Sequence, residues 1–334
     1  MKSLILTTSD AGAGWLQQAK IADRVEALAH RLLPGRPPTT SETAAFFAPR
    51  HDAQGDDFHH WQNWISISDR RRFGRSGPGL VETCRKFDAI ELWIDPGPHA
   101  QLVLLQLLDF LRPHGEIVRK LVLRQADGRI GERGTEHIPH WTPPAETVGF
   151  HHLETARLAW DAFRAPTPEA WCDLQTRDLA ALPYLRRSVL TLLDELPAVG
   201  TALGATERIL LTLISPGGPV PFYSPGYRRI IDLGVFDYWE VGQALDRLAH
   251  CPCPAVLGLD EGPFTLALHD DGGRYQRYKA SRLSLSPLGQ ALLEDREDFS
   301  RHNPIHRWWG GSELTRDRLW RWDASNAALI PPAP

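Results

Sequence analysis

The 334-residue sequence contains no long hydrophobic run. Its most apolar later stretch, from Leu102 to Leu111, is interrupted by Gln106 and Asp109, whereas a helix needs roughly 20 apolar residues to cross a bilayer. The apolar run at the N-terminus ends at Thr7, which makes it too short for the hydrophobic region of a secretion signal. We therefore expect a cytoplasmic chain without a membrane span.

The sequence is also poor in cysteine. Its four cysteines are Cys84, Cys172, Cys251 and Cys253, and they show no paired spacing beyond one C-x-C, so they cannot form a disulfide framework in so long a chain. This pattern of cysteine residues indicates that the protein resides in a reducing compartment. His250 precedes the C-x-C, and thiolate and imidazole suit zinc. Because no second pair of such ligands lies nearby in the sequence, we expect no metal site.

An excess of positive charge is lacking as well. The chain has 37 Lys and Arg against 41 Asp and Glu, a formal net charge of −4, and this gives no overall basic field of the kind that drives non-specific binding to nucleic acid. No catalytic constellation is visible either. The sequence therefore leaves open whether the protein is an enzyme, and it specifies no cofactor.

Hydrophobic residues are plentiful, at 42% of the chain. That is enough to bury substantial cores, and the length exceeds the usual size of one domain, so we expect two or three packed units. We predict four segments: an α/β domain over 1–145, a helical linker domain over 146–200, a winged-helix-like domain over 201–300, and a tail over 301–334 that packs on the body of the protein.

Strands and helices alternate in the first part of the chain. Residues 3–8 are predicted to form a strand, followed by an acidic turn and a helix-like stretch over 13–33 that a turn near Ala22 would split. The pattern of strand, loop and helix returns at 90–112, and 118–124 form a third β-rich run. Strands that alternate with helices predict a parallel α/β sheet over roughly 1–140, with Leu4, Leu6, Leu92 and Ile94 buried in it.

The pattern changes from His151 onward. Three helical periodicities with prolines at their edges cover 153–163, 168–179 and 182–196. The order that follows is that of a winged helix-turn-helix: predicted helices at 206–215, 227–234 and 237–249, a β-pair formed by 255–260 and 263–268, and a closing helix within 282–297.

The tail is rich in tryptophan and arginine. Trp308, Trp309, Trp320 and Trp322 are interleaved with four arginines. Such rings could stack on bases, but large rings more often bury against the preceding domain with guanidinium groups lying over them. We favour the anchoring interpretation.

Several segments together resemble a known bacterial family. They are the first strand ending at Ser9-Asp10, the run DRVEALAHRLLPGRPP, the run DAIELWIDPGPHAQLVLLQLLDFL, and later signatures such as GATERILLTL and NPIHRWWGG. In this order they resemble the family catalogued as domain of unknown function 1835. The family pattern has an acidic residue and a Gly-Pro step where this chain reads AHRLLPGRPP, with His30 and Arg31 at positions where acids would be expected. Because that family is uncharacterised, the resemblance implies an architecture and no activity.

Two strand ends are candidates for a ligand site, because open parallel sheets bind ligands beyond the carboxyl ends of their strands. Ser9 and Asp10 end the first strand and precede a loop of small residues. The later strand ends in Trp93 and Ile94, and the candidates there are Trp93, Asp95, His99 and Gln101. The alternative for both places is a tight turn with a helix N-cap.

The only dense basic run is RRRFGR, from Arg70 to Arg75. Within it, Arg72 and Arg75 are candidates for neutralising a phosphate, because Arg makes bidentate contacts with such oxygens. A solvated loop is the alternative interpretation.

The functional hypothesis is an accessory or ligand-binding protein, in which the α/β domain binds a small anionic ligand or a protein partner and the winged-helix-like half is a protein-interaction module. One alternative is an enzyme acting on a phosphorylated or nucleotide-like substrate at the strand ends. Another is a DNA-binding regulator, but the stretch from Ala205 to Ser300 has more acids than bases, and phosphate repels such a surface.

Overall fold

The computed structural model describes residues 1–28, 30–50, 60–61, 77–132, 134, 140–141, 143–220 and 227–333. The chain divides into two compact units. The N-terminal unit comprises Met1–Leu32, Pro37–Phe163 and Arg177–Arg186, and the C-terminal unit comprises Leu33–Arg36, Arg164–Thr176 and Arg187–Pro334. Each unit is described by itself.

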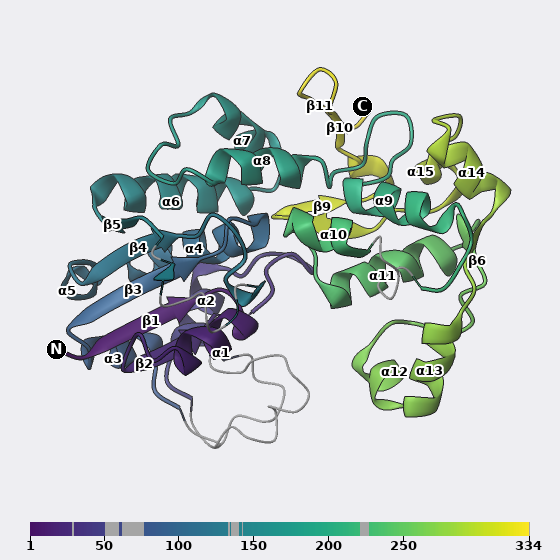
Figure 1. Cartoon of the computed structure of the whole chain (residues 1–334). Helices are drawn as coiled ribbons and strands as arrows, with labels where there is room; N and C mark the ends of the chain where they lie inside the picture. The colour runs from purple at the N-terminus through teal and green to yellow at the C-terminus, as the bar shows by residue number, and fades with distance from the viewer. Residues whose placement is uncertain are drawn as a thin grey trace. The chain divides into compact units, whose positions relative to one another are not determined.

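A five-stranded sheet forms the centre of the N-terminal unit (Figure 1). Its strands are β1 (Ser3–Thr7), β2 (Arg24–Ala27), β3 (Ala89–Ile94), β4 (Leu121–Gln125) and β5 (Ala145–Thr147), in the order β2-β1-β3-β4-β5. The first four run parallel, which confirms the predicted α/β class. Leu4, Leu6, Leu92 and Ile94 are fully buried, as predicted.

The helix-like stretch predicted over 13–33 is wrong in its second half. Helix α1 (Asp10–Gln18) ends early, Lys20 takes a positive φ of 53°, and the chain continues as β2. Strand β2 forms because Val25 and Ala27 pair with Ile5 and Thr7 and enter the same core. The alternating pattern Arg-Val-Glu-Ala suits a half-buried strand better than a helix.

The sheet also departs from the all-parallel prediction at one edge. Strand β5 pairs antiparallel to β4, with Val122 opposite Thr147. The three residues of β5 are all exposed, and an exposed edge strand lacks the continuous apolar run that marks a buried parallel strand. Sequence periodicity therefore did not reveal it.

Helices cover both faces of the sheet. The chain passes from β1 through α1 to β2 on one side, and from β3 through α4 (Pro98–Leu111) to β4 on the other. Right-handed crossovers in opposite directions put α1 and α4 on opposite faces. The remaining elements of this unit are α2 (Thr40–Phe47), α3 (Leu80–Arg85), α5 (Gly115–Val118), the 3₁₀ turn η1 (Ile130–Glu132) and α6 (Phe150–Phe163), which packs on α4.

The C-terminal unit is mainly helical. Its elements are α7 (Glu169–Asp173), η3 (Leu174–Thr176), most of α8 (Leu185–Leu193), α9 (Ala205–Ile214), α10 (Tyr227–Leu233), α11 (Tyr238–Ala249), β6 (Val256–Leu257), α12 (Leu266–Asp270), α13 (Gly272–Ala280), β7 (Ser284–Leu285), α14 (Pro287–Leu293) and α15 (Phe299–His302). Helices α9 and α11 share one apolar core with Phe264 and Tyr278.

The β-pair predicted for 255–260 and 263–268 is wrong. Val256 and Leu257 pair instead with Leu285 and Ser284, and residues 266–270 form α12. Helices α12 and α13 thus occupy the connection that a short wing turn would fill. Phe264 and Leu268 are buried in the core around α11. Their burial determines which local structure residues 263–268 adopt.

The tail forms two small hairpins, β8 (Arg307–Trp309) with β9 (Ser312–Leu314) and β10 (Arg321–Asp323) with β11 (Ala328–Ile330), separated by η5 (Arg316–Arg318). Trp309 and Trp322 are buried. Their indole Nε1 atoms donate to the backbone oxygen of Leu192 at 2.7 Å and to Oδ1 of Asp194 at 2.9 Å. These two rings therefore attach the tail to the end of α8.

Candidate functional site

The strand order reverses direction between β1 and β3. From β1 the chain moves outward to β2, and from β3 it moves outward the other way to β4. In doubly wound sheets ligands bind beyond the carboxyl ends of the strands at such a switch point. Because Thr7 lies opposite Trp93 in the parallel register, the two predicted strand ends lie side by side at this edge.

On the α1 face, the residues of the first strand end act as a helix cap. Ser9 is the N-cap of α1, and its Oγ accepts a hydrogen bond from the Gly12 amide at 3.0 Å. Asp10 is exposed in the first helical turn, where its Oδ1 accepts from the Ala11 amide at 2.8 Å. The turn-and-cap alternative thus describes this loop, with Ser9 rather than Asp10 as the cap.

Asp95 is engaged by a different backbone amide. Its Oδ1 accepts from the Ile130 amide at 2.9 Å, which holds η1 at the end of β3. Burial raises the pKa of Asp95 to about 6, although the hydrogen bond from Ile130 and the nearby Arg129 oppose this. Trp93 packs in the core with α1, and its Nε1 donates to Glu91 at 2.7 Å. The structure therefore brings Asp10 and Asp95 to one edge and gives each its own backbone partner.

Gln101 connects α4 to the end of β3. Its Nε2 donates to the backbone oxygen of Asp95 at 2.9 Å, and its Oε1 is buried without a hydrogen-bond partner. His99 lies two residues earlier, which places it about 200° away around the helix. The two predicted residues thus share the first turns of α4 but lie on different sides of it.

His99 instead shares a helix face with Gln106, seven residues later. Gln106 Nε2 donates to Thr43 Oγ1 at 3.3 Å, and its Oε1 lies 2.6 Å from Nε2 of His30. The His30 ring also packs 4.5 Å from the ring of Phe46 on α2. A polar chain therefore runs from α2 through Gln106 to His30, which lies three residues beyond the end of β2.

The two imidazoles are neutral at pH 7. Burial lowers the pKa of His30 to about 4, against the hydrogen bond with Gln106 and together with Arg31. Burial also lowers the pKa of His99 well below its usual value, with further contributions from Arg31 and His30, while a hydrogen bond to the His30 backbone opposes the shift. The neutral rings of His30 and His99 therefore lie close to each other and to the positively charged Arg31.

The hydrogen bond to Gln106 fixes which ring nitrogen of His30 carries the proton. His30 donates from Nε2 to the amide oxygen of Gln106, so its Nδ1 is bare. His99 Nε2 is buried without a hydrogen-bond partner.

Five buried atoms near the carboxyl ends of β1, β2 and β3 have no hydrogen-bond partner: Thr7 Oγ1, Thr8 Oγ1, His30 Nδ1, His99 Nε2 and Gln101 Oε1. They lie on both faces of the sheet, because Thr7 shares the α1 face with Ile5 and Trp93, whereas His99 belongs to α4 on the other face. We call these five residues the switch-point cluster. An unmade buried hydrogen bond costs roughly 1–3 kcal/mol, so their concentration at the place where α/β sheets bind ligands is the main feature of the site.

The sequence identified His99 and Gln101 but missed the rest of the cluster. The sequence predicts a helix where β2 lies, so it gives no signal that His30 follows a strand end, and it predicts Thr8 as part of the first strand. The seven-residue spacing of His99 and Gln106 was a usable signal for a shared helix face. Arg72 and Arg75, the other predicted residues, lie outside the described residues.

Comparison with known proteins assigns no family and no function to this site. No protein-family model matches the chain, and no curated protein sequence matches it. Within the described residues, no three His, Cys, Asp or Glu side chains are grouped so that they could hold a metal ion. The same part of the chain contains no helix with the length and apolar character needed to cross a membrane.

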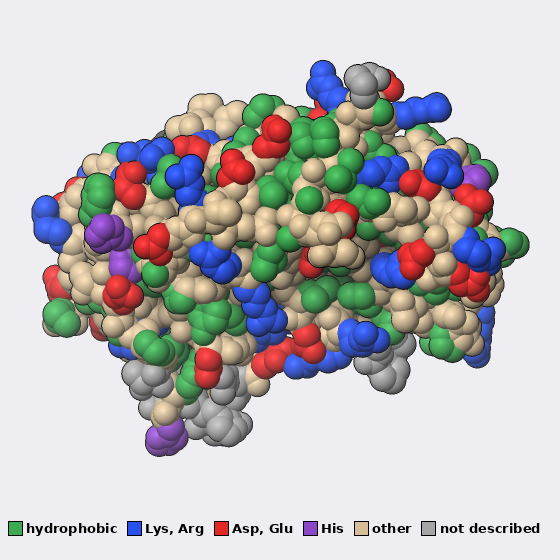
Figure 2. Space-filling model, turned by 90° about the horizontal axis from the view of Figure 1, so that it is seen from above, with side chains coloured by type: hydrophobic (Ala, Val, Ile, Leu, Met, Phe, Trp, Pro, Cys, Tyr) green, Lys and Arg blue, Asp and Glu red, His purple; other side chains and the backbone are tan. Residues whose placement is uncertain are grey.

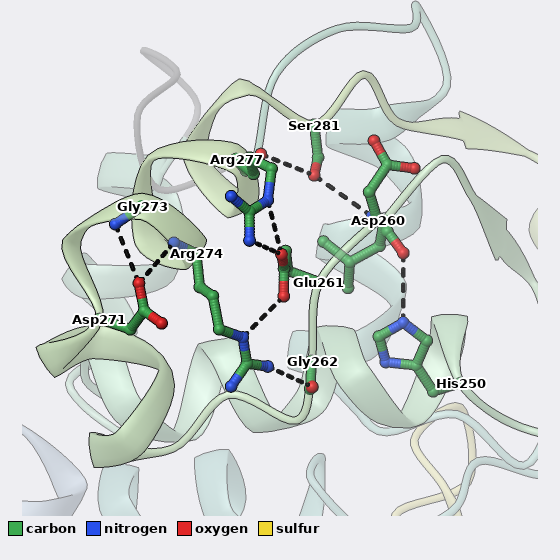
Figure 3. A network of polar contacts seen from close by, with 10 residues as sticks. His250, Asp260, Glu261, Gly262, Asp271, Gly273, Arg274, Arg277 and Ser281 are labelled. Atoms are coloured by element: carbon green, nitrogen blue, oxygen red, sulfur yellow. Dashed lines mark hydrogen bonds and ion pairs between the residues drawn. The ribbon is translucent and has the colours of Figure 1, made fainter.

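The second polar network lies in the C-terminal unit around α13 (Figure 3). Glu261 accepts from Arg274 Nε at 2.9 Å and from Arg277 Nε at 2.8 Å, and Arg274 also donates to the Gly262 backbone oxygen at 3.0 Å. Asp271 caps α13 through the amides of Gly273 and Arg274. The two arginines of this helix are thus held by a carboxylate of the same unit.

Helix α11, the third helix of the winged-helix-like order, is mostly enclosed. Val241, Ala244, Leu245 and Leu248 are fully buried in the core. Of its twelve residues only Gln243 and Arg247 are exposed, and Arg247 pairs with Glu207 at 3.4 Å. The helix therefore presents little basic surface of its own.

Proposed function

We propose that the N-terminal unit binds a small anionic ligand at the switch-point cluster, and that the C-terminal unit is a protein-interaction module. The observation that carries the proposal is the switch point between β1 and β3, near which buried polar atoms of Thr8, His30 and His99 have no hydrogen-bond partner. A bound ligand supplies the missing partners, and by mass action it stabilises the folded protein.

The charges near the cluster favour an anionic group. Arg31 is close enough to lower the pKa of His99, and α1 and α4 both begin at this edge. The N-termini of helices carry partial positive charge and free amides that bind anions. A phosphate or carboxylate is therefore the group that we expect here.

Binding is better supported than acid-base catalysis. A useful general base has a pKa near the working pH, whereas His30 titrates at about 4 and His99 is also shifted far down. Asp95 has a pKa of about 6, but its Oδ1 is occupied by the Ile130 amide. An enzyme acting on a phosphorylated substrate remains the second candidate function, because the same cluster would bind such a substrate.

The test compares two threonines of the same unit. Thr8 Oγ1 has no partner, whereas Thr83 Oγ1 donates to the Gly79 backbone oxygen at 3.0 Å, and both residues are buried. We expect Thr8→Val to leave the unliganded protein at least as stable as the wild type, and Thr83→Val to cost about 0.5–1.5 kcal/mol. Urea denaturation measures both.

Ligand binding is the second half of the test. Native mass spectrometry and thermal shift of the full chain are run against phosphate, dicarboxylates, sugar phosphates and nucleotides. We expect at least one anion to raise the melting temperature of wild type and Thr83→Val, and to raise that of Thr8→Val much less. If no anion shifts the wild type, or if Thr8→Val destabilises as much as Thr83→Val, the cluster is structural and the proposal fails.

The interaction role of the C-terminal unit rests on its charges. Three arginines of this unit are paired with carboxylates: Arg247 with Glu207, and Arg274 and Arg277 with Glu261. Acidic and basic side chains are interspersed on the face that Figure 2 shows. A protein partner suits such a mixed surface better than a polyanion does.

We also propose that the chain belongs with the 1835 family and acts in the cytoplasm. The N-terminal segments that resemble that family coincide with β1, with β2 and with β3 and α4. All four cysteines are free, which suits a reducing compartment.

A further inference from the structure

Cys251 and Cys253 occupy the turn that follows α11, and both thiols are free. The chain bends at each residue from His250 to Cys253. Residues two apart in a chain have Cα atoms at most roughly 7 Å apart even when it is extended, and the bends shorten this separation into the range of about 4.4–6.8 Å that a disulfide requires. The backbone of the turn therefore allows the two cysteines to be joined.

The Cys251 side chain lies beside the backbone of Cys253. Its thiol donates to the backbone oxygen of Cys253, with 3.4 Å between sulfur and oxygen, and the same sulfur lies 3.8 Å from the backbone oxygen of Leu248. A thiol is a weak donor, so little is lost when its proton leaves and the sulfur turns toward the Cys253 side chain.

The loop that carries the two thiols is fixed by hydrogen bonds to its backbone. The buried Asn303 accepts from the Cys253 amide through Oδ1 at 2.8 Å and donates from Nδ2 to the Cys253 backbone oxygen at 2.9 Å. The Ala255 amide donates to the Leu248 backbone oxygen at 2.9 Å and so closes the loop. Because folding has already ordered this loop, a disulfide within it removes little further conformational entropy.

The two thiols differ in their access to solvent. Cys253 is exposed, whereas Cys251 is half-buried and packs against the core of the C-terminal unit. Burial also raises the pKa of the Cys251 thiol, and a thiol reacts through its thiolate. A small-molecule oxidant therefore reaches Cys253 first, and Cys251 is the neighbouring thiol that can displace it.

We infer that Cys251 and Cys253 form a reversible disulfide when the protein is exposed to a small-molecule disulfide such as oxidised glutathione. This inference concerns the C-terminal unit and is independent of ligand binding at the switch-point cluster.

The reaction has two exchange steps. The Cys253 thiolate attacks one sulfur of the oxidant, which forms a mixed disulfide and releases one glutathione thiolate. Cys251 then loses its proton to solvent, and its thiolate attacks Sγ of Cys253, so that the second glutathione leaves as a thiolate. The two cysteines are thus oxidised by two electrons, and the oxidant is reduced to two molecules of glutathione.

The experiment incubates the full-length protein with oxidised and reduced glutathione at a series of ratios. After quenching with acid, intact mass spectrometry and peptide mapping identify the products. We expect the wild type to become lighter by two hydrogen atoms through a link between Cys251 and Cys253, with little glutathione on Cys253. Dithiothreitol should restore the reduced mass.

Cys251→Ser tests the order of the two steps. This variant lacks the thiol that displaces glutathione, so the share of protein with glutathione on Cys253 should be at least tenfold larger than in the wild type. Cys172→Ser is the matched control, because Cys172 is another half-buried thiol but has no cysteine near it in the sequence. We expect it to form the Cys251–Cys253 link as the wild type does.

The same oxidation in urea separates the effect of the fold from that of the sequence. We expect the folded protein to form the link at a share of oxidised glutathione at least tenfold lower than the unfolded chain needs. Equal requirements of the folded and unfolded protein would overturn the inference. So would a wild type that keeps glutathione on Cys253, that forms no such link even in oxidised glutathione alone, or that links either cysteine to Cys172 instead.

Discussion

His30 stabilises the fold only while it is neutral. Its ring is held by Gln106 and Phe46, and burial lowers its folded-state pKa to about 4 from 6.5. As the pH falls below 6.5, the unfolded chain takes up a proton on this residue while the folded protein does not. The contribution of His30 to stability is therefore complete above pH 6.5 and is lost progressively toward pH 4.

A first prediction follows for His30→Gln. This variant loses the packing on Phe46, so it should be less stable than wild type at pH 7. Because it has no imidazole to titrate, the difference should shrink on going to pH 5, by at most about 1.4 kcal/mol per pH unit. Urea denaturation of both proteins at the two pH values measures this. A difference that is constant or grows as the pH falls would contradict a neutral buried His30.

Asp95 behaves in the opposite direction. Its folded-state pKa is raised to about 6 from 3.8, so the folded protein holds this proton more tightly than the unfolded chain does. Above pH 6 the buried carboxylate is therefore a cost to folding, and below about pH 4 the two states are equally protonated.

We predict that Asp95→Asn is more stable than wild type at pH 8, by on the order of 1–2 kcal/mol, with a much smaller difference at pH 4. An asparagine Oδ1 can still accept from the Ile130 amide. The matched variant is Asp10→Asn, at an exposed residue bonded only to the next amide, which should change stability little at either pH. Thermal melts of both variants at the two pH values test this prediction. If the two substitutions change stability by the same amount, Asp95 is not desolvated.

At the scale of secondary-structure elements, α11 shows how one glycine allows another segment to pack directly against a helix. Gly242 lies in the middle of this helix, and a Cβ at that position would collide with the ring of Phe264. Phe264 belongs to the core of the C-terminal unit, together with Leu245 and Leu268. The glycine therefore allows the segment that leads into α12 to lie directly on α11.

We predict that Gly242→Ala destabilises the C-terminal unit by about 1–3 kcal/mol, as overpacking does in tight cores, even though alanine is the better helix former. Gly272→Ala, at the start of α13 where an added Cβ meets nothing within 4 Å, should be neutral or slightly stabilising. Chemical denaturation followed by tryptophan fluorescence tests the pair. A neutral Gly242→Ala would mean that Phe264 moves without cost.

At the scale of the whole molecule, the charge distribution argues against nucleic acid as a partner. The net charge is −4, and Arg247, Arg274 and Arg277 are paired with carboxylates. These three arginines are therefore less available to neutralise phosphates, and salt-dependent affinity grows with the number of phosphates neutralised.

We therefore predict no salt-sensitive binding of the purified protein to duplex DNA at micromolar concentration. Fluorescence anisotropy with duplexes of mixed sequence, at low and at physiological salt, is the measurement. Nanomolar binding to any duplex at physiological salt would restore the regulator hypothesis and refute the interaction role.

The sequence by itself determined the alternation of β1, α1, β3, α4 and β4, because long periodic segments such as 90–112 bury the same residues in any parallel sheet. It also determined that Ser9, Asp10 and Asp95 lie at strand ends. Only the tertiary structure decided that Arg24–Ala27 is a strand, since its four residues gain their hydrogen bonds from β1. The switch-point cluster has the same origin. His30, Thr8 and His99 are far apart in the sequence, and the order of strands in the sheet brings them to one edge, where burial leaves their acceptors without partners.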